Sequence, residues 1–187
     1  MELYKRIIEI VDANLIYCLI PIILTLLLVE LIFKNRFETK KVLNLIRWTI
    51  IFYAIITWTI ILIGMALYPK ESAFINRATG PYKIAYWIMF LSALILPFTL
   101  LVKKLSSKFW YVLLVAFCMK IGVYFERFVI ITTSFHRDYQ TENGNAGLTE
   151  SISFGIGMLF LQGIIIAILT LGVFELIKRK KTGYNTV

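Results

Sequence analysis

The chain has little of what metal and haem sites are built from. It holds one histidine, His136, and two cysteines, Cys18 and Cys118, in 187 residues. A haem held between two histidines of this chain is therefore excluded by count, and so is a metal site with several histidines. The cysteines lie in two separate apolar runs without CxxC spacing, which argues against a disulfide, a zinc site or an iron–sulfur cluster. Any redox centre that works with this chain is expected to belong to a partner.

Acidic residues are also scarce, with 11 Asp and Glu against 20 Lys and Arg. Apolar residues make up 59% of the chain, and five apolar runs approach or exceed the roughly 20 residues that a spanning helix needs. Inside lipid, backbone polar groups have to be satisfied within the protein, which favours helices and excludes a soluble enzyme core. The sequence therefore predicts an all-α integral membrane protein with five transmembrane helices, four of which form a bundle.

The predicted organisation has three parts. Residues 1–13 form an interfacial lead-in, residues 14–177 the transmembrane helical domain, and residues 178–187 a basic cytoplasmic tail. The five expected spans are about 14–33, 45–68, 82–102, 109–133 and 152–177. Proline is expected to start the third span at Pro81 and to kink it at Pro97. Four glycines along the fifth span suit close contact between helices: Gly155, Gly157, Gly163 and Gly172.

Loop charge predicts the orientation. The loops after the first and third spans and the tail after the fifth carry 12 Lys and Arg when Arg47 at the start of the second span is included, against six on the opposite side when Lys83 at the start of the third is included. By the positive-inside rule the N-terminus is outside and the C-terminus inside. The net charge of +9 thus indicates topology and attraction to anionic lipid, and not nucleic-acid binding.

Ionisable residues within the spans are the first candidates for a functional role. Lys120 is expected near mid-bilayer, and Glu126 and Arg127 close to the outer boundary. Together with Glu30 they could form a proton path or intramembrane charge pairs. The plainer alternatives are that Lys120 pairs with a carboxylate of another span or with lipid headgroups, and that Glu30 pairs with Lys34 one turn on.

Polar residues of the two expected outer loops are candidates for docking a partner, because loops carry contacts more often than spans do. Arg77 lies in the first of these loops, and His136, Arg137 and Asp138 begin the second. The alternative is that these are solvated loop charges without a partner.

Several short motifs resemble those of a known membrane family. They are Phe74-Ile75-Asn76-Arg77-Ala78-Thr79-Gly80-Pro81-Tyr82, Ala85-Tyr86-Trp87-Ile88-Met89, Glu126-Arg127-Phe128 and Thr133-Ser134-Phe135-His136-Arg137-Asp138. Over roughly residues 40–139 the chain is similar to the C-terminal half of the quinol-interacting membrane subunit of alternative complex III. That subunit belongs to the NrfD-type family, which includes the membrane subunit of polysulfide reductase. The chain differs from the longer relatives at Leu62, where an acid is expected, and at Lys120, where they look uncharged.

The resemblance implies a subunit of a quinol-oxidising complex in the bacterial cytoplasmic (inner) membrane. Members of the family bind no cofactor of their own and pass quinol electrons to an iron–sulfur subunit docked on one membrane face. Only the second of their two bundles is represented here, so quinone or quinol is expected only together with a partner subunit. The partners implied are the lipid bilayer, other membrane subunits, and iron–sulfur and haem-carrying cytochrome subunits on the extracytoplasmic face. Alone, the chain is expected to be non-catalytic.

Two other functions stay open from the sequence. The chain could be an independent ion or solute translocator whose polar path is lined by Lys120, Glu126 and Arg127, although five spans without an internal repeat argue against a transporter. It could also be a truncated, inactive copy. Glu126 and Arg127 would fix the outer docking face in the first function, or Glu126 would relay protons there.

Overall fold

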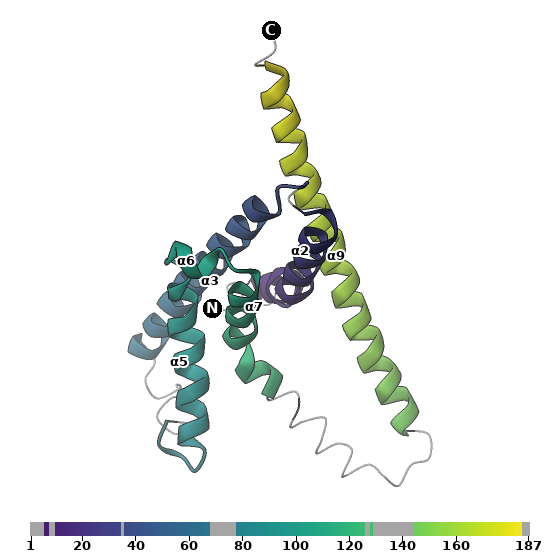
Figure 1. The fold of residues 1–187 in the computed structure, drawn as a ribbon. Coiled ribbons are helices and arrows are strands. Elements are labelled where there is room, and N and C mark those ends of the chain that lie inside the picture. The colour runs from purple at the N-terminus through teal and green to yellow at the C-terminus, as the bar shows by residue number, and fades with distance from the viewer. Residues whose placement is uncertain are drawn as a thin grey trace. The chain divides into compact units, whose positions relative to one another are not determined.

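The computed structural model describes residues 6–7, 10–34, 36–67, 78–125, 128 and 144–184, and of the last range the side chains of 154–180. Every regular element within these residues is a helix (Figure 1). Three helices are long and apolar enough to cross a membrane: Asp12–Phe33, Thr39–Leu67 and Phe154–Lys180. The predicted all-α membrane protein is confirmed at this level.

The three long helices correspond to the first, second and fifth predicted spans. The first consists of a π-helical stretch, η1 (Asp12–Ile16), and α2 (Leu19–Phe33); the second is α3 (Thr39–Leu67); the third belongs to α9 (Gly144–Tyr184). The other two predicted spans contain shorter helices, α5 (Lys83–Thr99) and α7 (Phe109–Met119), joined through α6 (Lys103–Ser106). At 1.5 Å per residue α5 is about 26 Å long, against a hydrocarbon layer of about 30 Å. Five spans and an outward N-terminus therefore stay predictions.

Two compact units make up the chain. Unit 1 contains Met1–Ile46 and Thr132–Val187, and unit 2 contains Arg47–Ile131. The boundary falls inside α3, so the start of this helix belongs to unit 1 and the remainder to unit 2. Each unit has its own set of packed helices, which are described separately below.

Close contact between α2 and α9 builds unit 1 (Figure 1). A Cβ atom added to Gly163 would lie 2.6 Å from Cγ of Pro21 and 3.2 Å from the carbonyl oxygen of Cys18. Ala167 and Leu171, one and two turns further along α9, are buried on the same side. Since lipid supplies no hydrophobic drive between helices, van der Waals packing at small residues is what can hold such a pair together.

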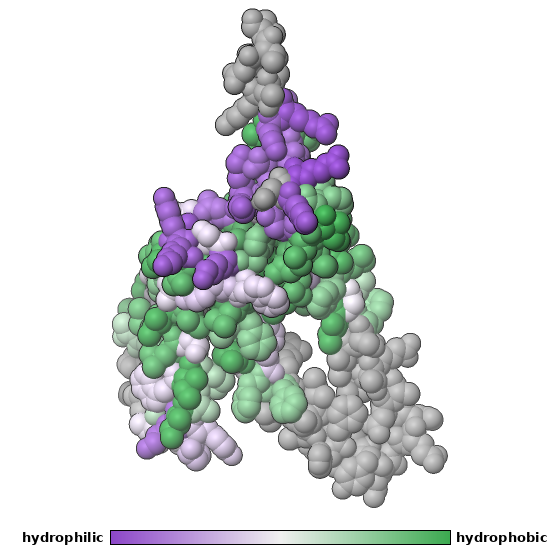
Figure 2. All heavy atoms as spheres, viewed as in Figure 1, coloured by the Kyte–Doolittle hydropathy of each residue, from purple (hydrophilic) through white to green (hydrophobic). Residues whose placement is uncertain are grey.

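The remaining glycines of the fifth predicted span do not share this environment. A Cβ atom at Gly155, Gly157 or Gly172 would have nothing within 4 Å. Near them α9 presents large apolar side chains to its surroundings, among them Phe154 at 70% and Ile168 at 57% exposure. Figure 2 shows this hydrophobic surface giving way to hydrophilic residues toward the C-terminal end of α9. Such a surface suits contact with lipid or with a further membrane helix.

Aromatic contacts join the helices of unit 2. The ring centroids of Trp58 on α3 and Phe90 on α5 are 4.9 Å apart in an edge-to-face arrangement, and the indole N–H of Trp58 donates to the carbonyl of Ala93 at 3.3 Å. The hydroxyl of Tyr111 on α7 donates to Oγ1 of Thr99 at the end of α5, at 2.7 Å. Edge-to-face pairs and buried polar tips of this kind fix the orientation of bulky rings.

Both prolines of the third predicted span lie at its ends. The turn at Gly80 and Pro81 precedes α5, and the N–H of Lys83 donates to the carbonyl of Gly80 at 3.1 Å. Proline at a helix start costs no hydrogen bond, as the sequence predicted. Pro97, which was expected to kink the span, lies in the last turn of α5, and the N–H of Leu100 bonds three residues back to its carbonyl at 3.2 Å. The helix ends there in a tightened turn.

Candidate functional site

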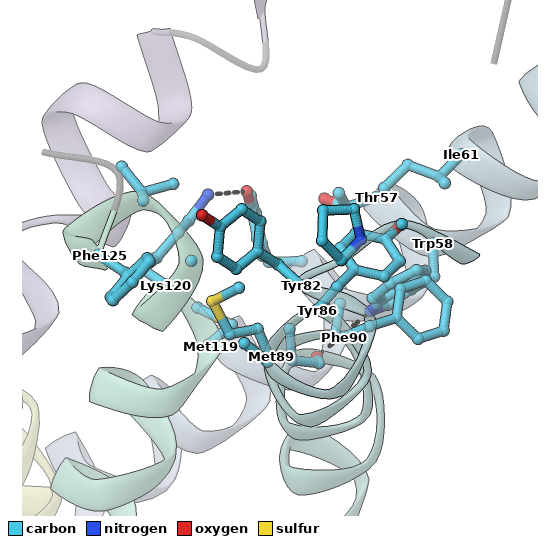
Figure 3. Close-up of a pocket in the computed structure, with 18 residues that line it drawn as sticks. Thr57, Trp58, Ile61, Tyr82, Tyr86, Met89, Phe90, Met119, Lys120 and Phe125 are labelled. Carbon is cyan, nitrogen blue, oxygen red and sulfur yellow. Dashed lines mark hydrogen bonds between the residues drawn. The ribbon is translucent and has the colours of Figure 1, made fainter. Parts of the chain in front are cut away.

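An apolar pocket of about 920 Å³ lies within unit 2, between α3, α5 and the residues around the end of α7 (Figure 3). The aromatic part of its wall comes from Trp58 on α3 and from Tyr86 and Phe90 on α5. Pro81 and Tyr82 line it at the start of α5. Pockets of this size that combine apolar walls with a few polar groups are the usual form of small-molecule sites.

Lys120 supplies the charged group of the pocket. Its ammonium Nζ donates a hydrogen bond to the hydroxyl of Tyr53 at 2.8 Å, drawn as a dashed line in Figure 3. The same nitrogen lies 5.1 Å from the centroid of the Tyr53 ring, within the range of a cation–π contact. By helix rise Lys120 lies about 16 Å along from the start of α7, and its mid-bilayer depth stays a prediction.

The backbone at Lys120 departs from the continuous helix predicted for residues 109–133. α7 ends at Met119, and Lys120 has φ −114° and ψ 14°. Its N–H bonds to the carbonyl of Phe117 at 3.2 Å, three residues back, while its carbonyl accepts the N–H of Tyr124 at 3.1 Å and opens a new turn. Gly122, directly after the break, has little helix propensity and faces the sulfur of Met89 at 3.9 Å. Hydropathy alone cannot register such an interruption.

Glu30 belongs to unit 1 and has a different partner from those expected. Its carboxylate accepts a hydrogen bond from Oγ1 of Thr39, the first residue of α3, which is 1% exposed. The predicted partner Lys34 sits at the C-terminal cap of α2 with a left-handed backbone, φ 36° and ψ 79°. Because the chain leaves the helical path at that residue, the spacing rule for helix neighbours does not apply to it.

A second polar cluster connects the start of α3 with α9 in unit 1. Glu175 accepts the backbone N–H of Glu38 at 3.0 Å and so caps α3 from a distant part of the chain. The carboxylate of Glu38 lies 3.2 Å from Nζ of Lys41 and 3.2 Å from Nζ of Lys178. Hydrogen bonds from Lys41 and then Lys178 hold the pKa of Glu38 below its usual value. These contacts join the start of α3 to α9. We therefore interpret the cluster as structural and not as a catalytic site.

The other candidate residues lie outside the described residues. These are Glu126 and Arg127 of the fourth predicted span, and Arg77, His136, Arg137 and Asp138 of the outer loops. Their roles in charge pairing and partner docking stay predictions. Among the residues that the structure does describe, no three His, Cys, Asp or Glu side chains are grouped so that they could hold a metal ion.

Sequence reasoning singled out Lys120 but missed the residues around it. Tyr53, Thr57 and Ile61 recur every fourth residue on α3, and all three line the pocket. Tyr86 and Phe90 repeat the same spacing on α5. Such a spacing places side chains on one helix face, but lipid-facing side chains follow the same spacing, so it does not by itself identify the pocket.

Comparison of the chain with models of protein families, with curated proteins and with solved structures finds no match in any of the three. The pocket, the broken helix and the polar cluster are therefore interpreted from their own geometry and chemistry.

Proposed function

We propose that the chain is a membrane subunit of a quinone-linked respiratory electron-transfer complex of the bacterial cytoplasmic membrane, similar in kind to alternative complex III. The observation that carries the proposal is the ordered run of motifs between residues 74 and 138, which resembles the quinol-interacting membrane subunit of that complex. Of these motifs, Gly80 to Tyr82 and Tyr86 lie at or near the start of α5 and line the pocket of unit 2. These four motif residues thus belong to one packed region of unit 2.

In this function the chain is the scaffold and its partners carry the redox groups. Arg127 suits a structural role at the outer boundary, because its planar guanidinium can donate to carbonyls or a carboxylate in a fixed geometry. Glu126 would pair with Arg77 or Arg137 and help to hold the outer loops. Iron–sulfur and cytochrome subunits would dock on that face, where His136 and Asp138 add polar groups.

The surface of unit 1 is suited to a neighbouring membrane subunit. Leu161 and Ile165 on α9 are 52% and 48% exposed, and Phe154 and Ile168 are more exposed still. Lipid covers such a surface as readily as protein does, so the surface permits a second subunit without identifying one. A partner that supplies the first bundle of the family, and with it a quinone site, fits the proposal.

Purification in mild detergent from the native membrane tests the proposed function. The expected result is co-purification of iron–sulfur and cytochrome subunits, identified by mass spectrometry, with haem absorbance in the optical spectrum. In the proposed complex the haem belongs to the cytochrome subunits, and a haem held between two histidines cannot form from the single histidine of this chain. Recovery of the chain alone, with no haem absorbance and no other subunit, would contradict the proposal.

Glu126→Gln tests the docking face more narrowly. Loss of one charge-assisted contact is expected to weaken subunit association about tenfold and to lower the yield of cofactor-bearing complex on a native gel. Insertion of the chain into the membrane should be unchanged. Glu150→Gln, which removes an acid from the same outer side, is the matched control and should leave the yield as it is. An unchanged yield for Glu126→Gln would count against the docking role.

The contact between Lys120 and Tyr53 inside a pocket is the one observation that favours a translocator. The two functions differ in what the purified chain does alone. A translocator reconstituted into liposomes would move an ion or solute without other subunits, and Lys120→Met would abolish the flux. A complex subunit would show no flux. An inactive copy would neither transport nor co-purify with partners.

A further inference from the structure

We infer that the turn between α5 and α7 is a docking site for the headgroup of an anionic phospholipid. The site consists of the three exposed lysines of this turn, Lys103, Lys104 and Lys108, which we call the turn lysines. The inference does not depend on the chain's place in a respiratory complex, because it rests on the turn itself and on α5 and α7 lying in the bilayer. The backbone of the turn, its charge and the apolar side chains beside it each support it.

The backbone of the turn holds the turn lysines close together. α6 is a single helical turn, and directly after it the N–H of Lys108 donates to the carbonyl of Leu105 at 3.1 Å. The hydroxyls of Ser106 and Ser107 both donate to the carbonyl of Lys103, at 3.3 and 2.6 Å. Ser106 is 5% exposed, whereas all three turn lysines are exposed. The turn is thus fixed by its own hydrogen bonds, and its three ammonium groups face the surroundings.

The helices next to the turn lysines contain no acidic residue. The sequence has no Asp or Glu between Glu71 and Glu126, so α5, α6 and α7 supply no counter-ion. Unit 1 differs, because Nζ of Lys41 and Nζ of Lys178 each lie 3.2 Å from the carboxylate of Glu38. Lysines near a membrane surface are attracted to anionic lipid. An anionic headgroup is therefore the counter-ion that a bilayer offers to this turn.

Apolar side chains on both sides of the turn distinguish a lipid from a free anion. Leu101 and Val102 before α6 are 51% and 52% exposed, and Trp110 after it is 70% exposed. Figure 2 shows hydrophilic residues gathered over α6 next to a hydrophobic surface. Tryptophan is enriched where a bilayer meets water, and exposed apolar side chains gain by contact with acyl chains. A phospholipid supplies both a phosphate and acyl chains, whereas a soluble phosphate supplies only the first.

The net charge of the headgroup decides which phospholipid the turn lysines prefer. Each lysine ammonium has three N–H donors and no acceptor, and its hydrogen bonds to phosphate oxygens are about twice as strong as neutral ones. Phosphatidylcholine also carries a phosphate, but its trimethylammonium group is repelled by the lysines. Phosphatidylglycerol carries the phosphate without a cation. The turn should therefore bind phosphatidylglycerol in preference to phosphatidylcholine.

Quenching of tryptophan fluorescence provides the test. The full chain is placed in phosphatidylcholine nanodiscs, and part of the lipid is replaced by phosphatidylglycerol brominated near the head of its acyl chains, or by phosphatidylcholine with the same brominated chains. Trp110 lies two residues after Lys108, so a lipid docked at the turn should quench it. The expected result is that half-maximal quenching requires about fivefold less phosphatidylglycerol than phosphatidylcholine, the ratio that one lysine near an anionic surface supplies.

Substitutions assign the preference to the turn. A triple variant with Met at the positions of all three turn lysines should lose the preference for phosphatidylglycerol, and one with Arg there should retain it because the charge is kept. Trp110→Phe should remove the part of the quench that differs between the two lipids. A matched control, which should keep the preference, removes three exposed basic residues of unit 1: Lys40→Met, Arg179→Met and Lys180→Met. Circular dichroism checks that each variant is folded.

Four results would overturn the inference. The first is equal quenching by the two brominated lipids in the unchanged protein, and the second is a preference that survives the three Met substitutions in the turn. The third is a preference that survives Trp110→Phe, because the anionic lipid would then lie elsewhere. The fourth is relief of the quench by soluble glycerol phosphate beyond that caused by sodium chloride at the same ionic strength. The turn would then bind the free anion and not the lipid.

Discussion

The helices within unit 1 and those within unit 2 are held together by different kinds of contact. In unit 1 the backbones of α2 and α9 approach closely at Gly163, and polar contacts around Glu38 join the start of α3 to α9. In unit 2 large aromatic side chains keep α3 and α5 apart and leave a pocket between them. Close packing favours a fixed pair of helices, whereas bulky and partly exposed rings leave room for a ligand. The comparison predicts that a substitution at a helix contact costs more unfolding free energy in unit 1 than in unit 2.

The largest effect should come from breaking the close approach in unit 1. In Gly163→Ala the new Cβ would meet the Pro21 ring at 2.6 Å, and a proline ring has no rotamer by which to move away. The expected cost is about 1–3 kcal/mol of unfolding free energy, as for other overpacked sites. Gly172→Ala, where nothing lies within 4 Å, is the control and should be neutral or stabilising because alanine favours helix. Denaturation in detergent followed by circular dichroism measures both, and equal stabilities would contradict the packing argument.

A smaller loss is expected in unit 2 from Phe90→Ala. The variant removes the edge-to-face contact with Trp58 at 4.9 Å, a kind of pair that contributes about 0.5–1.5 kcal/mol. Because Phe90 lines the pocket and is only half-buried, its loss leaves less of a closed cavity than truncation in a dense core would. Tyr82→Ala, at an 82% exposed position, provides the comparison. A cost for Phe90→Ala that exceeds that of Gly163→Ala would reverse the contrast between the units.

The polar contacts of unit 1 predict a dependence on pH. Lys41 and Lys178 lower the pKa of Glu38 from its usual value of 4.5 in the folded chain. The stabilisation is therefore fully present above pH 4.5 and is lost as the pH falls through the lowered pKa. In Glu38→Gln the loss of stability on acidification should be smaller. Above pH 6 the dependence of stability on pH should be nearly the same in both proteins. Thermal unfolding between pH 3 and pH 7 checks this, and identical profiles for both proteins would refute it.

The smallest effect should come from Gly122 in unit 2. A Cβ at Gly122 would have its nearest neighbour, the sulfur of Met89, at 3.9 Å, which is ordinary contact. Gly122→Ala should therefore lower the unfolding free energy by less than about 0.5 kcal/mol. The higher helix propensity of alanine favours an increase instead. Comparison of its change in unfolding free energy with that of Gly163→Ala shows how the same substitution affects the two units. A large loss at Gly122 would show that unit 2 is packed as tightly as unit 1.

Hydropathy was enough to predict the helices of the first, second and fifth spans, and the proline at position 81 predicted the start of α5. It could not give the partner of Glu30, because Thr39 lies beyond a reversal of the chain at Lys34. Apolar patterns describe a helix, whereas reversals depend on how the chain folds back on itself.

The candidate site was predictable only in part. Lys120 stood out as a charge within an apolar run, which needs no structure to notice. The pocket beside it depends on which faces of α3 and α5 meet, and in lipid both the inner and the outer face of a helix are apolar. Tyr53 and Trp58 therefore could not be told from lipid-facing aromatics by sequence alone.

The cap that Glu175 places on α3 sets an order of events during synthesis. Glu38 and Glu175 are 137 residues apart. The start of α3 is therefore synthesised well before Glu175, the residue that accepts the hydrogen bond of the Glu38 N–H. Residues 47–131 of unit 2 are all translated in the interval. We expect the pocket of unit 2 to assemble first. The contacts of Glu38 with Glu175 and Lys178 in unit 1 form only after α9 has entered the bilayer.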